Sequence, residues 1–129
     1  MKPIKILCDI QHWEFSKWAR EKFHNLSLDI NRQVKLEICG GGELRPILKK
    51  DPSYDLTFVH LGSGASNKFI RSFESFRRFY AGLLIAESSM FEGNPEATDF
   101  ILNYFDAYIS FNLRNYEPIR EVLEQYRII

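Results

Sequence analysis

Hydrophobic residues recur along the chain with two different periods, and these periods alternate. Short, nearly continuous apolar runs predict strands that are buried on both faces of a sheet. These runs occupy residues 4–10, 34–39, 54–62, 80–89 and 106–111. Between them, apolar residues recur every three or four positions, which predicts amphipathic helices. The helical segments are 14–26, 40–50 (after an opening run of three glycines), 66–79, 94–105 and 115–129.

Three of these helices carry signals near their starts. Asn94 is placed to cap a helix that begins at Pro95, with Glu96 in its first turn. An asparagine cap, a first-position proline and an early acidic residue are all typical of a helix start. Asn115 is expected to cap the last helix, and Pro46 is tolerable near the start of its own helix.

The regular alternation predicts one α/β domain that spans residues 1–129. Strands that alternate with helices form a parallel sheet, because each helical crossover returns the chain to the same edge. We therefore expect a doubly wound, five-stranded, three-layer sandwich of the flavodoxin-like or Rossmann-like type. In the flavodoxin-like order 2-1-3-4-5, a ligand site forms at the carboxyl ends of the strands, beside the first and third.

Composition limits the classes of partner. Lys plus Arg and Asp plus Glu each total 17, so the formal net charge is zero. This balance argues against a general nucleic-acid or anionic-membrane binder. No apolar run approaches the roughly 18 residues of a membrane span, and no basic-then-apolar leader opens the chain. Cys8 and Cys39 fall in predicted strands, where buried, reduced thiols are expected. The expected location is cytoplasmic.

Polar and small residues gather where the predicted strands end. Parallel topology brings these positions to one edge of the sheet, so together they form the candidate site. They are Asp9, His12 and Trp13 after the first strand, Gly41 and Gly42 after the second, His60, Gly62, Ser63 and Gly64 after the third, and Glu87 and Ser88 after the fourth.

Several of these residues also have a purely structural interpretation. Asp9 can cap the first helix, Trp13 can pack that helix onto the sheet, and His60 can be a hydrogen-bonded core histidine. The glycine-rich segments 40–42 and 62–64 can approach an anion through backbone N–H groups or can simply turn the chain. Neither segment has the spacing of a dinucleotide fingerprint, a P-loop or a nucleophile elbow.

The remaining titratable residues indicate no metal site and no cofactor. His12, His24 and His60 do not have the spacing of metal ligands, and the chain contains no CxxC. Basic residues interleave with phenylalanines in segment 66–79. A solvated face opposite a core face explains this pattern better than nucleic-acid binding does. These basic residues are Lys68, Arg71, Arg77 and Arg78.

Nearly the whole chain resembles the receiver domains of response regulators. The segment YDLTFVHL looks like their third strand, and FDAYISFNLRNYEPIREVL looks like their fifth unit. In this resemblance His60 stands at the phosphoacceptor position and Phe111 stands near the position of the lysine. Asp9 alone could serve the acidic pocket, and Ser88 is nearest to the hydroxyl position. A receiver relative with these residues is expected to be inert to phosphorylation.

A second resemblance is to the N-terminal half of GT-B glycosyltransferases of the family-4-like type. Some of these enzymes begin with a strand followed by Asp-Val-Pro-x-Trp-Ala-Phe-x-x-x-Ala. Asp9, Trp13, Phe15 and Ala19 have this spacing. The segment YDLTFVHLGSG is similar to a strand and loop with which such enzymes bind acceptor or sugar. These enzymes bind the nucleotide sugar mainly in a C-terminal domain, so this resemblance implies a partner domain or subunit.

The glycosyltransferase resemblance implies an acceptor-side half-domain that is inactive alone and binds a sugar or a lipid-linked glycan acceptor. Trp13 would stack on the acceptor, and either His60 or Glu87 would be the catalytic base that takes a proton from its hydroxyl. The remaining acceptor-site residues would be Asp9, His12, Gly41, Gly42, Gly62, Ser63, Gly64 and Ser88. The alternative hypothesis is a phosphorylation-inert, receiver-like module that binds a partner protein through its fourth and fifth units.

Overall fold

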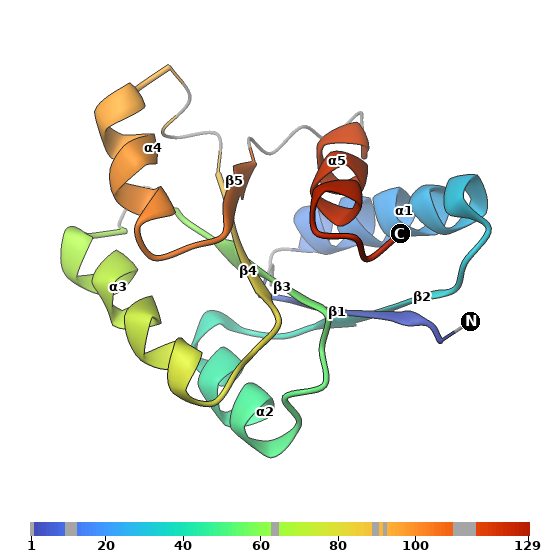
Figure 1. Ribbon diagram of the computed structural model, residues 1–129, viewed down its shortest axis with the longest axis horizontal. Helices are drawn as coiled ribbons and strands as arrows, with labels where there is room; N and C mark the ends of the chain where they lie inside the picture. The colour runs from blue at the N-terminus through green and yellow to red at the C-terminus, as the bar shows by residue number, and fades with distance from the viewer. Residues whose placement is uncertain (1, 10–12, 63–64, 89–90, 92, 110–115) are drawn as a thin grey trace.

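The computed structural model contains a five-stranded parallel sheet in the order β2-β1-β3-β4-β5, with helices on both faces (Figure 1). This arrangement confirms the predicted fold class and strand order. The structure describes residues 2–9, 13–62, 65–88, 91, 93–109 and 116–129, with the backbone alone at residues 13–16 and 41.

The strands are β1 (Ile4–Cys8), β2 (Val34–Ile38), β3 (Leu56–His60), β4 (Leu83–Glu87) and β5 (Ala107–Ile109). The helices are α1 (Trp13–Ile30), α2 (Leu44–Lys50), α3 (Asn67–Arg71), α4 (Pro95–Leu102) and α5 (Glu117–Gln125), with 3₁₀ segments η1 (Gly41–Glu43) and η2 (Ser72–Arg78).

Two details of the helices differ from the sequence-based expectation. The segment expected to form one helix over 66–79 is α3 followed by the 3₁₀ segment η2. The hydroxyls of Ser72 and Ser75 donate to the carbonyls of Phe69 and Ser72, three residues earlier, which suits the tighter 3₁₀ turn. The N-cap of α5 is Tyr116, one residue beyond the expected Asn115. The prediction for α4 is confirmed, because the Asn94 side chain accepts from the Ala97 N–H.

Two hydrophobic cores lie on the two faces of the sheet, because side chains of a strand alternate between faces. On one face α1 and α5 pack against the sheet through residues such as Phe23 and Leu123. On the other face α2, α3, η2 and α4 pack through residues such as Leu48, Phe73 and Ile101. The central strands β1, β3 and β4 are buried on both faces, as their continuous apolar runs predict.

Two aspartates join neighbouring strands at the edge of the sheet where the strands begin. Asp55 Oδ2 accepts from the Lys5 N–H at 2.8 Å, beside β1 and β3. Asp106 Oδ2 accepts from the Leu84 N–H at 2.8 Å and from the Arg77 guanidinium at 2.6 Å, beside β4 and β5. These carboxylates have a structural role, because they satisfy backbone N–H groups that the sheet leaves unpaired.

Both cysteines are buried and neither is part of a disulfide, as expected from their place in the sequence. Cys8 ends β1 and Cys39 follows β2, and the Cys39 N–H donates to the Cys8 carbonyl at 2.8 Å. Burial raises the pKa of the Cys39 thiol to about 12, so this thiol stays protonated at neutral pH.

No helix in the described part of the chain has the length and apolarity needed to cross a membrane.

Replacement of Gly82 by alanine is expected to destabilise the fold through steric overlap. The Tyr80 ring is buried against this glycine, and an added methyl carbon would lie 2.3 Å from the Tyr80 hydroxyl and 2.4 Å from the Tyr54 carbonyl oxygen. The shifts of Tyr80 and the backbone that are needed to accommodate the methyl group should lower the free energy of unfolding by roughly 1–3 kcal/mol. Gly42→Ala is the matched control, since no atom lies within 4 Å of its added carbon. Denaturant titrations of both variants measure the difference, and equal stabilities would contradict the steric explanation.

Candidate functional site

A histidine–glutamate pair lies at the carboxyl ends of β3 and β4. His60 and Glu87 are the last residues of these strands and are register partners, so their side chains lie next to each other on the same face of the sheet. His60 Nδ1 lies 2.8 Å from Glu87 Oε2. The glutamate is almost fully buried, whereas 36% of the histidine side chain is exposed. The pair therefore presents a half-exposed imidazole on top of a buried carboxylate.

Asp9 connects this pair to the end of β1. Its carboxylate Oδ1 accepts from the backbone N–H of His60 at 2.6 Å, although the two residues are far apart in the sequence. Asp9 is 9% exposed. The structure therefore brings together Asp9, His60 and Glu87, which the sequence analysis assigns to one site. Their proposed roles in binding and catalysis stay predictions.

The end of β4 is also tied to β5. Ser88 is fully buried, and its N–H donates to the Ile109 carbonyl at 3.1 Å. The Tyr108 hydroxyl donates to the Ser88 carbonyl at 2.6 Å. These two bonds place Ser88 within the rigid part of the sheet edge, next to Glu87.

Lys22 of α1 belongs to this environment, and the sequence analysis does not include it among the site residues. It is 8% exposed on the same face of the sheet as His60 and Glu87. Burial lowers the pKa of the Lys22 ammonium, and the negative charge of Glu87 opposes this shift. Its helical spacing could have revealed it, because Lys22 falls in phase with the buried Ala19, Phe23 and Leu26.

Burial and pairing displace the titration of two of the site residues. Burial raises the pKa of Asp9 to about 7, although the hydrogen bond from the His60 N–H acts in the opposite direction. The hydrogen bond to Glu87 raises the pKa of His60 above its ordinary value, against the opposing effect of burial. The pairing therefore favours the imidazolium form of His60, which a buried carboxylate holds and which can donate hydrogen bonds.

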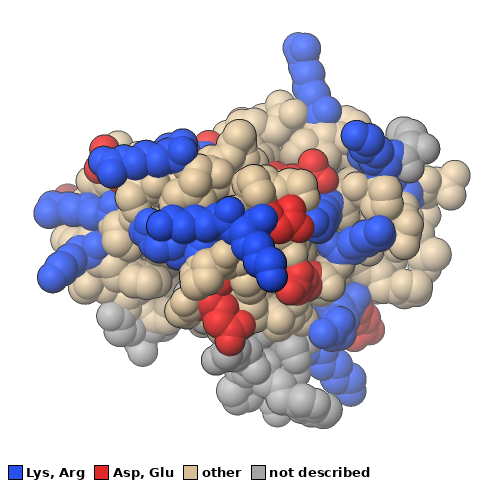
Figure 2. Space-filling view, turned by 90° about the horizontal axis from the view of Figure 1, so that it is seen from below, with Lys and Arg blue, Asp and Glu red and all other residues tan. Residues whose placement is uncertain are grey.

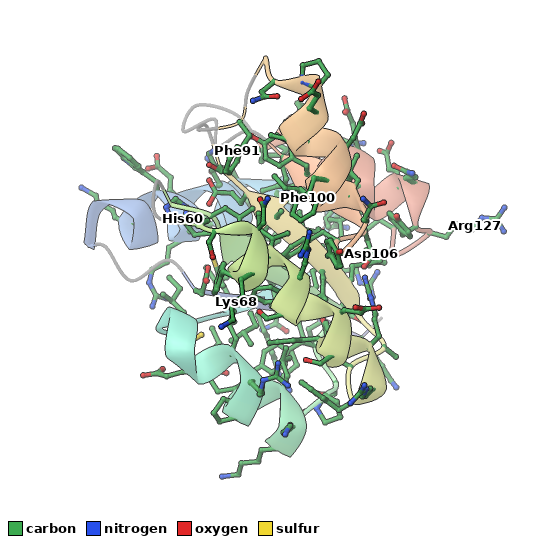
Figure 3. All side chains as sticks on the ribbon, turned by 90° about the vertical axis from the view of Figure 1, so that its left-hand side faces the viewer. His60, Lys68, Phe91, Phe100, Asp106 and Arg127 are labelled. Carbon is green, nitrogen blue, oxygen red and sulfur yellow. The ribbon has the colours of Figure 1, made fainter. Side chains whose placement is uncertain are left out.

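The other predicted site residues are only partly described. Gly42 and Gly62 both have open space where a side chain would extend, so no close packing requires a glycine at either position. His12, Ser63 and Gly64 lie outside the described residues, as do the side chain of Trp13 and the surroundings of Gly41. Figure 3 shows His60 and Phe91 towards one end of the molecule and Asp106 and Arg127 towards the other.

Within the ranges that the structure describes, no group of three or more His, Cys, Asp or Glu side chains could hold a metal ion. Asp9 and Glu87 are instead each committed to His60, one through the backbone and one through the ring.

The strand order defines a flavodoxin-like α/β domain, with polar residues at the carboxyl ends of its strands. The structure is similar to a CheY-like protein (TadZ) from Pseudomonas aeruginosa, with a TM-score of 0.63, 12% identity, and coverage of 93% of this chain and 97% of that one. It is also similar to the adenylate cyclase from Rhodopirellula baltica, with a TM-score of 0.64, 12% identity, and coverage of 96% of this chain and 87% of that one. No protein-family model and no curated protein matches the sequence.

These similarities concern the fold, and it is the fold that the receiver resemblance implies. Neither similar structure is a glycosyltransferase, so the expectation of a glycosyltransferase half-domain with a sugar or lipid-linked acceptor gains no support.

The raised pKa of Asp9 predicts that the Asp9→Asn variant becomes more stable than the native protein, and that this difference grows as the pH increases. Between the ordinary pKa of 3.8 and about 7, the folded state holds a proton that the unfolded state has lost, so the stability of the native protein falls as the pH rises. An asparagine oxygen can still accept from the His60 N–H but cannot ionise. The variant should therefore gain on the order of 2–4 kcal/mol over the native protein across this interval, with no further gain above it.

Denaturant titrations at a series of pH values measure this gain. Asp99→Asn, at an exposed position of α4, removes the same kind of carboxylate outside the site and is the matched control. A stability difference between Asp9→Asn and the native protein that does not change with pH would contradict the assignment.

The pair also predicts the titration of His60. Glu87→Gln keeps a hydrogen-bond acceptor of the same shape but removes the negative charge, so the pKa of His60 should fall. NMR titration of the imidazole carbon signals measures the change, with the exposed His24 of α1 as an internal reference. An unchanged His60 pKa in this variant would mean that the ion pair does not form in solution.

Proposed function

We propose that this chain is a receiver-like module that does not accept a phosphoryl group and that acts by binding a partner protein. The observation that carries the proposal is the 2.8 Å contact between His60 Nδ1 and Glu87 Oε2 at the ends of β3 and β4. In the receiver resemblance, His60 occupies the place of the phosphoacceptor aspartate. The nucleophilic carboxylate is therefore replaced by an imidazole that is already engaged.

The surrounding groups support the same conclusion. Phosphoryl transfer to a carboxylate depends on cations that neutralise the developing negative charge, and acidic side chains normally hold such a cation. Asp9 is the acidic residue available for this purpose, but its Oδ1 accepts from the His60 N–H. Its pKa of about 7 also makes it a weaker cation ligand than an ordinary aspartate.

The proposal assigns the function to surfaces rather than to turnover. The similarity to a CheY-like protein supports a module of the signalling type, and His60 supports independence from phosphorylation. In such a module the edge of the sheet keeps one arrangement, because the His60–Glu87 pair and the Tyr108–Ser88 hydrogen bond need no modification to form. Binding of the partner is then controlled by the amount or location of either protein.

The test uses a phosphoryl mimic. We expect that magnesium with beryllium fluoride, added to the ¹⁵N-labelled chain, leaves the amide signals of Asp9, His60 and Glu87 unchanged. A phosphorylatable CheY-type receiver under the same conditions is the positive control. Separate titrations with magnesium and with fluoride show any general effect of salt. Saturable shifts confined to Asp9, His60 and Glu87 that require both components would refute the proposal.

A further inference from the structure

Arginine side chains gather around a hollow on the face of the molecule that carries α2 and η2. This surface, the arginine hollow, has a volume of about 420 Å³ and is open to solvent. It is lined by Arg45, Arg71, Ser72, Glu74, Ser75 and Arg78. From the side of α2, Lys and Arg side chains extend across the left and centre of the face (Figure 2). The hollow is separate from the His60–Glu87 pair, none of whose residues line it.

Basic residues predominate in the helical segments that border the hollow, although Glu43 and Asp51 flank α2 at its two ends. Helix α2 contains Arg45, Lys49 and Lys50 and no acidic residue. The α3–η2 segment contains four basic residues, and Glu74 is its single carboxylate. Because the whole chain is neutral, the rest of the sequence contains more acidic than basic residues. Such a separation of charge is typical of a surface that recognises a partner of opposite sign.

Two of the three guanidinium groups that line the hollow lie over aromatic rings. Arg45 lies 4.6 Å above the centroid of the Phe76 ring, and its terminal nitrogen donates to Ser75 Oγ at 2.7 Å. Arg71 lies 5.5 Å above the Phe100 ring. Stacking leaves the edge of each guanidinium directed away from the ring, and it reduces the entropy lost when a ligand binds.

These cations have no acidic partner within the described part of the chain. The ion pairs among the described residues involve Lys5, His60, Arg77 and Arg120. No ion pair there includes Arg45, Arg71 or Arg78. Arg77 differs from its neighbours, because Asp106 binds it and it takes part in joining β4 to β5. The three hollow arginines are therefore available to carboxylates from outside the molecule.

We infer that the arginine hollow binds an acidic segment of a partner protein, with the forked guanidinium groups receiving its Asp or Glu carboxylates. This inference names the partner chemistry for the proposed protein-binding function and rests on that function. Guanidinium forks bind planar carboxylates with two parallel hydrogen bonds, which favours arginine over lysine at such a site.

Protein is the preferred partner because the rings under the hollow arginines are covered, and Phe69 is the one exposed ring on α3 and η2. Phe73 and Phe76 are buried, and Arg45 and Lys49 lie over the half-buried Phe79. Single-stranded nucleic acids need both a basic groove and accessible aromatic faces. Here the rings hold the cations instead of presenting their faces to a ligand.

A fluorescent peptide of alternating glutamate and serine tests the inference, with a glutamine–serine peptide of equal length as the uncharged control. Fluorescence anisotropy with the full chain should show binding of the glutamate peptide alone. Binding should weaken as the salt concentration rises from about 0.05 M to about 0.3 M, since exposed charges are screened. Arg71→Gln and Arg78→Gln should each raise the dissociation constant about five- to tenfold.

Two further variants make the test specific to this surface. Glu74→Gln removes the one carboxylate that lines the hollow and should tighten binding about two- to fivefold. Arg20→Gln, at an exposed position of α1 on the opposite face of the sheet, removes the same charge elsewhere and should change binding less than about twofold. Arg45→Lys keeps the charge but loses the fork, and it should weaken binding without unfolding the chain.

Several outcomes would overturn the inference. They are no binding of the glutamate peptide, equal losses in Arg20→Gln and Arg71→Gln, or tighter binding of a single-stranded oligonucleotide at about 0.15 M salt. Sedimentation that shows a dimer abolished by Arg71→Gln would assign the surface to a second copy of this chain. The beryllium fluoride titration reports on the His60 site alone. Failure of the peptide test would therefore leave the phosphorylation-inert function standing, and failure of the fluoride test would leave the arginine hollow standing.

Discussion

The register between β3 and β4 determines the chemistry at the edge of this sheet. His60 and Glu87 are register partners in a parallel ladder, so their side chains leave the sheet on the same side. This places them within hydrogen-bonding distance of each other. A shift of one residue in either strand would send one of the two side chains to the opposite core. It would leave a carboxylate buried without its partner, at a large cost in stability. Correct packing of β3 against β4 and formation of the polar pair are therefore the same event.

Carboxylates accept hydrogen bonds from backbone N–H groups at both ends of the strands. This structural role makes the function of an aspartate at a strand end difficult to assign from sequence. Asp55 and Asp106 accept hydrogen bonds from backbone N–H groups where strands begin, and Asp9 accepts one where β1 ends. All three connect two neighbouring strands. Asp9 differs in its surroundings, since it lies near a second buried carboxylate and a half-exposed histidine.

The periodicity of the sequence was sufficient to predict the fold. Apolar runs and helical stripes alternate clearly enough to give the strand order and, with it, the proximity of Asp9, His60 and Glu87. Two kinds of feature were beyond that reasoning. The 3₁₀ form of η2 is accompanied by serine hydroxyls that donate to backbone carbonyls, and the burial of Lys22 depends on how closely α1 packs against the sheet.

The glycosyltransferase resemblance shows a different limit of sequence reasoning. It depends on an aspartate at the end of a strand followed by apolar residues at helical spacing. The structure gives two of these residues a structural role. Asp9 accepts a hydrogen bond from the His60 N–H, and Ala19 is buried between α1 and the sheet. Any strand that turns into a helix covering a parallel sheet needs similar residues. A short motif of this kind therefore carries more information about the fold than about the substrate.

The two buried thiols allow local opening of the fold near the edge strand β2 to be measured by the rate of thiol labelling. Cys8 and Cys39 are joined through a backbone hydrogen bond and are almost inaccessible to solvent. A thiol reagent reaches the buried Cys39 only when the packing around this residue opens, and the high pKa of the thiol slows the reaction further. The labelling rate therefore reports how often the packing around Cys39 opens, without substitution of any residue. Comparison of Cys39 with the more central Cys8 would separate local fraying of the edge from unfolding of the whole domain.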